Sequence, residues 1–158
     1  MAWFKLHYPS AYYATFLTVR AKGFDAATML LDPHTCRQRI RELRSMDKAT
    51  AKDKEDQTAL ELVLEMNMRG IRLLPVDLYR SDVRRFTIEN GDLRCPLTSL
   101  GGLGESSALP IVEARRQGPF ISVEDLRSRA RLGQGVIDML RANGALEGLA
   151  ESNQISMF

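Results

Sequence analysis

Hydrophobic residues recur at helical spacing near the start of the chain. Within residues 10–21, Tyr12, Phe16 and Val19 fall on one face of a helix. This pattern predicts a short and largely buried helix. Residues 24–31 are expected to add one or two further helical turns.

A basic helix is predicted to follow over residues 36–46. Arg37, Arg41 and Arg44 share one of its faces. That face is either an ordinary solvated surface or a surface that tracks phosphates. Residues 47–57 are polar and are expected to form a loop or the frayed start of the next helix.

The clearest helix is predicted over residues 57–69. Apolar residues recur there at spacings of three and four, namely at Leu60, Val63, Leu64 and Met68. Gly70 is well placed to end this helix, because glycine readily adopts the left-handed conformation of a C-terminal cap.

The hydrophobic period then changes to that of a strand. Phe86 and Ile88 alternate with polar residues, and the Asn90-Gly91 dipeptide that follows is a strong turn signal. We expect a small antiparallel β-hairpin that pairs residues 84–89 with residues 92–96.

Short helices separated by glycines are predicted after residue 98. One runs through Arg116, and another begins at Ser122, with Asp125 three residues later as in a capping box, and runs through about Ala130. A last helix is expected over residues 136–142. The predicted fold class is therefore mostly α with one small β-hairpin.

Composition narrows the possible classes of protein. The chain has 158 residues, of which 44% are hydrophobic and 27% charged, so it can build a packed core. The net charge is only +2, which gives weak support for nucleic-acid binding, although 17 of the 22 basic residues are Arg. Two distant cysteines, no long apolar run and no signal peptide predict a cytoplasmic protein without a membrane segment.

The most informative motif is a glycine-rich turn before a helix, which we call hairpin 1. It comprises Gly101, Gly102, Leu103, Gly104, Glu105 and Ser106. Gly102 and Gly104 are expected to permit backbone angles that side chains obstruct, and to let a phosphate approach the main chain. Leu103 is expected to anchor the turn in the core. The free N–H groups of the following helix then form an anion site that needs no lysine.

A second turn of this kind, hairpin 2, lies some thirty residues later. It comprises Arg131, Leu132, Gly133, Gln134 and Gly135. Leu132 repeats the apolar anchor, but a clear Gly-hydrophobic-Gly is missing. Pro110 is a further departure, because it is expected to kink or delay the helix after hairpin 1. An ordinary glycine turn is the alternative interpretation of each hairpin.

The two hairpins together resemble the tandem helix-hairpin-helix DNA-binding domain, which grips the duplex backbone without reading sequence. The whole chain is similar to bacterial DNA polymerase III alpha subunits, notably the PolC type rather than DnaE. The resemblance is carried by residues 2–13, 76–82, 96–105, 118–126 and 140–146 in the same order.

This resemblance implies the C-terminal part of a replicative DNA polymerase. In the family, the carboxylates that bind Mg²⁺ lie in an upstream palm, so no catalytic residue, metal or cofactor is expected in this chain. The chain alone is not expected to polymerise DNA. Asp77 and Asp82 are interpreted as turn and cap residues, and His7 and His34 as structural.

The end of the chain carries a separate motif. It consists of Gln154, Ile155, Ser156, Met157 and Phe158. These residues resemble the sliding-clamp-binding peptide of PolC-type polymerases, with Met157 in place of the more usual Leu. An extended peptide can insert two apolar side chains into a pocket while a glutamine hydrogen-bonds at its rim.

The expected organisation is a fingers-type region over residues 1–97, a tandem helix-hairpin-helix domain over 98–147 and a clamp-binding tail over 148–158. The expected partners are duplex DNA, the sliding clamp (beta subunit) and the upstream palm and fingers, but no membrane. Two alternatives stay open. One is a stand-alone, non-catalytic helix-hairpin-helix protein, and the other is a helical protein-interaction module.

Overall fold

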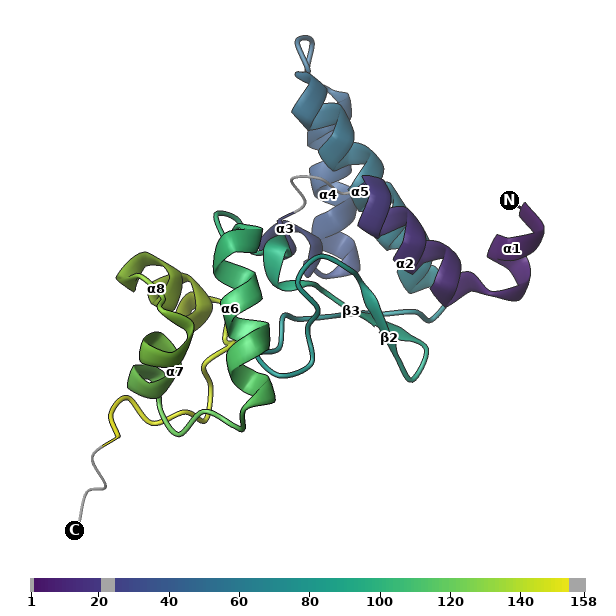
Figure 1. Ribbon diagram of the computed structural model, residues 1–158. Coiled ribbons are helices and arrows are strands. Elements are labelled where there is room, and N and C mark those ends of the chain that lie inside the picture. Colours follow the sequence, from purple (N-terminus) through teal and green to yellow (C-terminus); the bar gives the residue numbers. More distant parts are fainter. Residues whose placement is uncertain (1, 21–24, 154–158) are drawn as a thin grey trace.

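The computed structural model describes residues 2–20 and 25–153, which form helices around a small sheet (Figure 1). The first helices are α1 (Ala2–His7), α2 (Pro9–Arg20), α3 (Ala26–Met29), α4 (Pro33–Arg44) and α5 (Ala51–Met68). The strands are β1 (Leu73–Leu74), β2 (Thr87–Glu89) and β3 (Asp92–Arg94). The remaining helices are the 3₁₀ helix η1 (Leu97–Ser99), α6 (Glu105–Arg116), α7 (Val123–Ala130) and α8 (Gln134–Ala142). The predicted fold class is confirmed.

Helix α2 forms where it was predicted, but a different face of it is buried. Tyr13 and Leu17 are buried, whereas Val19 is 61% exposed. The buried face packs on the sheet and on α5, where the Tyr13 hydroxyl donates to Glu65 Oε1 at 2.9 Å. Helix α1 was not predicted, and its aromatic residue Trp3 is 63% exposed.

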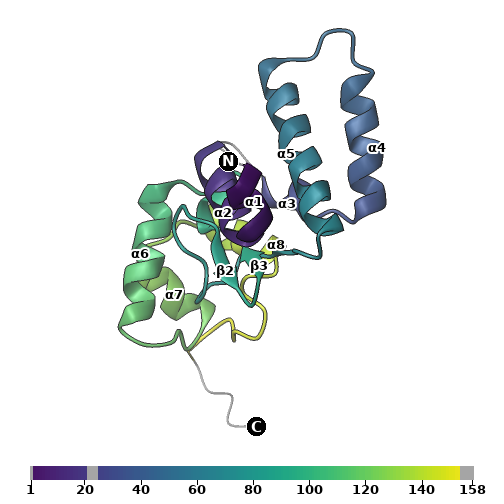
Figure 2. The ribbon, with the colours of Figure 1, turned by 90° about the vertical axis from the view of Figure 1, so that its right-hand side faces the viewer.

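Helices α4 and α5 pack against each other as a pair that projects from the rest of the molecule (Figure 2), and α5 also contacts α3. Helix α4 begins earlier than expected, because Asp32 caps it by accepting from the backbone N–H of His34 at 2.9 Å and of Thr35 at 3.1 Å. Helix α5 also begins earlier. Thr50 and Asp53 form a reciprocal capping box, so residues 51–57 of the segment expected to be a loop or the start of the next helix belong to α5.

The apolar stripe of α5 is only partly as predicted. Leu60 and Val63 are fully buried, but Met66 takes the place expected for Met68, which is 75% exposed. The helix ends at Met68, and the chain returns to the core at Ile71, which is buried. Gly70 follows with a φ of +78°, and the predicted glycine cap is confirmed.

The β-hairpin is confirmed, with shorter strands than expected. Strand β2 pairs antiparallel with β3, and Asn90 and Gly91 both have positive φ in the turn. The unpredicted β1 adds parallel to the other side of β3, which gives the strand order β1-β3-β2. Strand β3 is buried along its whole length, whereas Ile88 on the edge strand is 49% exposed.

Helices α6 to α8 gather at the end of the molecule away from the α4–α5 pair (Figure 1). Ser122 caps α7 by accepting from the Asp125 N–H at 3.0 Å, as predicted. Pro110 lies inside α6, yet the helix begins at Glu105 and continues to Arg116 without a break. The expected delay of this helix is therefore wrong.

Buried side chains form one cluster that extends from Tyr13 to Leu146. The α6–α8 unit therefore shares its core with the preceding helices and sheet, and the boundary at residue 97 stays a prediction. Both Cys36 and Cys95 are buried free thiols, and burial raises the pKa of Cys95 to about 12. No helix in the described ranges is long and apolar enough to span a membrane.

Candidate nucleic-acid interface

Hairpin 1 is a tight turn that connects η1 to α6. The Leu103 N–H donates to the Leu100 carbonyl at 3.0 Å, and Gly102 between them has a φ of +92°. A positive φ at the third residue of such a turn favours glycine. Leu103 is buried, as predicted, while the other five residues of hairpin 1 are exposed.

The surroundings of Gly102 add a close contact, although with the end of a flexible side chain that can shift. A Cβ atom at this position would lie 3.0 Å from the Cε of Met139 in α8. Gly101 lies beside Asp25 at the start of α3, with 3.7 Å between its ideal Cβ and the Asp25 Oδ1. Hairpin 1 is thus held between α3 and α8.

Gly104 is a different case and corrects the sequence-based interpretation. It is the N-terminal cap of α6, with an ordinary φ of −78° that any residue adopts. A Cβ atom there would meet nothing closer than the Ser106 Oγ at 3.8 Å. The fold therefore does not need glycine at 104. The remaining physical reason for glycine is that a ligand can approach the backbone closely from the solvent side.

Hairpin 2 repeats this geometry with a different residue pattern. Arg131 has the positive φ, at +53°, Leu132 is buried, and Gly133 caps α8 with a φ of −73°. Positions 131, 132 and 133 thus correspond to positions 102, 103 and 104. Gln134 and Gly135, expected in the turn, lie in the first turn of α8.

Neither of the two caps satisfies the first N–H groups of its helix with its own side chain, because both are glycine. The first intrahelical bonds of α6 start at the Ser107 and Ala108 N–H groups, which donate to the Gly104 carbonyl at 3.1 and 3.0 Å. The Glu105 and Ser106 N–H groups precede those bonds at the positive end of the helix dipole. Each hairpin can therefore offer several backbone donors to an anion.

Part of the arginine excess is structural. Arg129 donates to the carbonyls of Ala114, Gly118 and Pro119, and Arg115 donates to those of Leu78 and Ser81. The missed polar neighbour of hairpin 1 is Arg84, which pairs with Glu105. No local sequence pattern predicts the contact between Arg84 and Glu105, because the two residues are distant in sequence.

Of the three arginines on the predicted basic face of α4, two have no ion pair within the described structure. Arg37 and Arg41 are exposed, and Arg44 pairs with Glu61 at 2.7 Å. Arg44 therefore serves the packing of α4 on α5. A phosphate-tracking role for this face stays a prediction.

The expected turn and cap roles of Asp77 and Asp82 are confirmed. Asp77 Oδ1 accepts from the Tyr79 and Arg80 N–H groups at 2.8 and 2.9 Å. Asp82 Oδ1 accepts from the two N–H groups that follow it at the same spacing, each at 3.0 Å. Within the described part of the chain, no three His, Cys, Asp or Glu residues are grouped to hold a metal ion.

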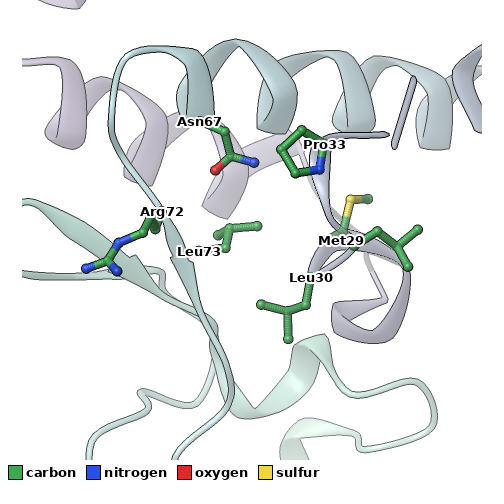
Figure 3. Close-up of a pocket in the computed structure, with 7 residues that line it drawn as sticks. Met29, Leu30, Pro33, Asn67, Arg72 and Leu73 are labelled. Carbon is green, nitrogen blue, oxygen red and sulfur yellow. The ribbon is translucent and has the colours of Figure 1, made fainter. Parts of the chain in front are cut away.

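An apolar hollow of about 380 Å³ lies between α3, the start of α4 and the end of α5 (Figure 3). Its lining consists of Met29, Leu30, Leu31, Pro33, Asn67, Arg72 and Leu73. Figure 3 shows the Arg72 guanidinium turned away from the other labelled residues, and it pairs with Asp92 at 2.8 Å. The lining of the hollow thus offers few polar groups to a ligand.

The predicted clamp-binding residues 154–158 lie outside the described residues. The segment just before them docks on the start of α7. The Val123 and Glu124 N–H groups donate to the carbonyls of Ala150 and Glu151 at 2.8 and 3.2 Å, and Ser122 bonds to Asn153. Asn153 therefore lies at the opposite end of α7 from hairpin 2.

Comparison with known proteins agrees with this geometry. Residues 70–155 match the family model for the helix-hairpin-helix motif, and the chain belongs to this family. Over its whole length, the chain is 45% identical to the DNA polymerase III PolC-type of Caldanaerobacter subterraneus subsp. tengcongensis. It is 43% identical to that of Clostridium perfringens and 39% identical to that of Thermotoga maritima. The chain spans only 11–12% of the length of these relatives.

Proposed function

We propose that this chain is the C-terminal part of a PolC-type replicative DNA polymerase, and that it holds product duplex DNA by the sugar–phosphate backbone. The observation that carries the proposal is the pair of exposed glycine caps, Gly104 and Gly133, each in ordinary backbone geometry with open space around it. Backbone N–H groups at two helix starts can bind phosphates on a duplex without reading its sequence.

The proposed contact explains why a net charge of only +2 suffices. Backbone donors and helix dipoles supply the attraction that lysines supply elsewhere. The similarity to polymerases over the whole chain favours a polymerase segment over a stand-alone DNA-binding protein. Nucleotidyl transfer with Mg²⁺ belongs, in this proposal, to a palm outside the chain.

We further propose that residues 154–158 tether the polymerase to the sliding clamp. The support is the residue pattern, in which Gln154 is followed after a spacer by Met157 and Phe158. The docking of residues 150–153 at the far end of α7 from hairpin 2 is compatible with simultaneous contacts to DNA and clamp.

The DNA proposal is tested by placing side chains at the two caps. Gly104→Val and Gly133→Val should each weaken duplex binding about tenfold, because a branched side chain blocks the phosphate from the backbone. For each variant, the loss should be the same on duplexes of unrelated sequence. Fluorescence anisotropy with labelled duplexes measures this effect.

Thermal melting of each variant provides the control. Valine is a poorer helix cap than glycine, which costs about 1 kcal/mol, so the proteins should stay folded at the temperature of the assay. Folded valine variants that bind duplex as tightly as the parent would show that the hairpins are ordinary turns.

A further inference from the structure

Hairpin 1 has a charged neighbour from another part of the chain. The Nε atom of Arg84 lies 3.1 Å from the Oε1 atom of Glu105, the first residue of α6. The two side chains are 63% and 51% exposed. Arg84 precedes β2 and lies outside hairpin 1, yet the ion pair brings its guanidinium to the start of α6.

The backbone that carries Arg84 is fixed to the segment leading into hairpin 1. Asp82 accepts from the Arg84 N–H with its side chain and from the Leu97 N–H with its carbonyl, at 3.0 and 2.9 Å. The Thr98 N–H donates to the Val83 carbonyl at 3.1 Å. Arg84 is thus positioned by the fold relative to hairpin 1.

The ion pair also changes the electrostatics of hairpin 1. The Glu105 carboxylate favours the start of a helix but repels a phosphate approaching the same N–H groups. Arg84 offsets that charge. The salt bridge engages its Nε, and within the described structure its two terminal nitrogens have no hydrogen-bond partner. A guanidinium has five donors, so Arg84 can bind a phosphate without leaving Glu105.

Hairpin 2 shows the same arrangement with a neutral partner. Gln134 is the first residue of α8, as Glu105 is of α6, and its Oε1 accepts from Arg127 Nη1 at 3.1 Å. Beside each hairpin, an arginine from outside it therefore contacts the side chain of the first residue of the following helix. The recurrence on two unrelated contacts favours a shared role at the proposed phosphate site.

We propose that Arg84 is a phosphate-binding residue of hairpin 1, held beside the start of α6 by Glu105. This inference rests on the proposed function and adds to it a side-chain contact from outside the helix-hairpin-helix turns. Its ligand is a backbone phosphate of duplex DNA.

The experiment is a salt titration of duplex binding with the full chain. Arg84→Ala should make the negative slope of log K against log salt concentration shallower by about 0.9, the value for one phosphate contact. It should also weaken binding about eightfold at 0.1 M salt. Arg84→Lys should retain most of the slope, because an ammonium still binds phosphate.

Arg85→Ala is the matched control. Arg85 follows Arg84 in the same loop but lines a shallow hollow with Ala14 and Thr18 of α2. Removing this equal charge should leave the slope unchanged. An Arg84→Ala slope equal to that of the parent or of Arg85→Ala overturns the inference.

Failure of the inference can be separated from failure of the proposed function. If Gly104→Val loses binding while Arg84→Ala behaves as the parent, only the role of Arg84 is wrong. If neither variant changes binding, both the hairpin site and the role of Arg84 are wrong.

Discussion

At the scale of single residues, the physical reason for a glycine differs between positions in similar motifs. Gly102 is needed by the fold, because its φ is +92°, a left-handed conformation that favours glycine. Gly104 and Gly133 have ordinary backbone angles and open surroundings. Arg131 takes the left-handed position in hairpin 2, which costs about 1 kcal/mol relative to glycine. Residue type alone does not separate these cases.

Arg129 joins the end of α6 to α7. Its guanidinium donates to three backbone carbonyls, pairs with Asp125 at 3.2 Å and lies 4.7 Å from the ring centre of Phe120. Arg129→Ala should lower the free energy of unfolding by about 2–3 kcal/mol, because hydrogen bonds from a charged donor are lost and half-buried carbonyls are left unsatisfied. Urea denaturation measures this change.

Arg127→Ala is the control for charge removal on the same helix. Its exposed side chain bonds to the side chain of Gln134, so stability should change by less than about 0.5 kcal/mol. Equal destabilisation by both variants would show that Arg129 acts through helix charge rather than through its carbonyl contacts.

At the scale of elements, helix boundaries depend on caps and buried faces depend on neighbours. Asp32 and Thr50 extend α4 and α5 beyond their apolar stripes, since a cap satisfies N–H groups whatever the residues behind it. The buried face of α2 is fixed by the sheet and by α5. Ser10 in the first turn of α2 donates to the Gly91 carbonyl of the β-turn at 2.7 Å.

The β-hairpin gives a pH prediction. Asp92 accepts from the Arg72 backbone N–H at 2.9 Å and from its guanidinium, and these bonds hold the pKa of the Asp92 carboxyl below its usual range. Arg94 likewise lowers the pKa of Glu89. A folded pKa below the unfolded one contributes stability that is fully present above the unfolded pKa, near 4, and is lost as pH falls through the folded value.

Stability should therefore decrease as the pH falls below about 5, and Asp92→Asn should weaken this dependence. The variant should be less stable than the parent at pH 7, and the difference should shrink toward pH 3. Urea denaturation at pH 7, 5 and 3 measures it, with Glu55→Gln on the exposed face of α5 as the control. A constant difference across this range would contradict the role of the Asp92 charge.

At the scale of the whole molecule, α7 separates two proposed functions. Hairpin 2 follows its last residue, and residues 150–153 dock at its first. A helix of eight residues spans about 12 Å, so contacts at its two ends need not interfere.

A chain ending at Ser156 tests the proposed tail. Loss of Met157 and Phe158 should abolish capture by a purified sliding clamp, because burial of each such side chain is worth roughly 1.5–3 kcal/mol. Duplex binding and the melting temperature should stay the same, and Gln154→Ala should have a smaller effect. Equal capture of the full and shortened chains would show that the tail does not bind the clamp.

The sequence alone determined the class of fold and the place of both hairpins. Its local signals sufficed where one residue type dictates geometry, as in the Asn90-Gly91 turn, the Gly70 cap and the Leu103 anchor. The apolar anchor Leu132 between two short helices indicated hairpin 2 even without a Gly-hydrophobic-Gly motif.

Only the tertiary structure decided which faces are buried and which charges meet. Met68 and Val19 continue their helical periods yet are exposed, because burial depends on a neighbouring element rather than on spacing. The unpredicted β1 is too short for any period to reveal. The contact of Arg84 with Glu105 joins two turns through the packing of the segment before α6, and no local pattern encodes it.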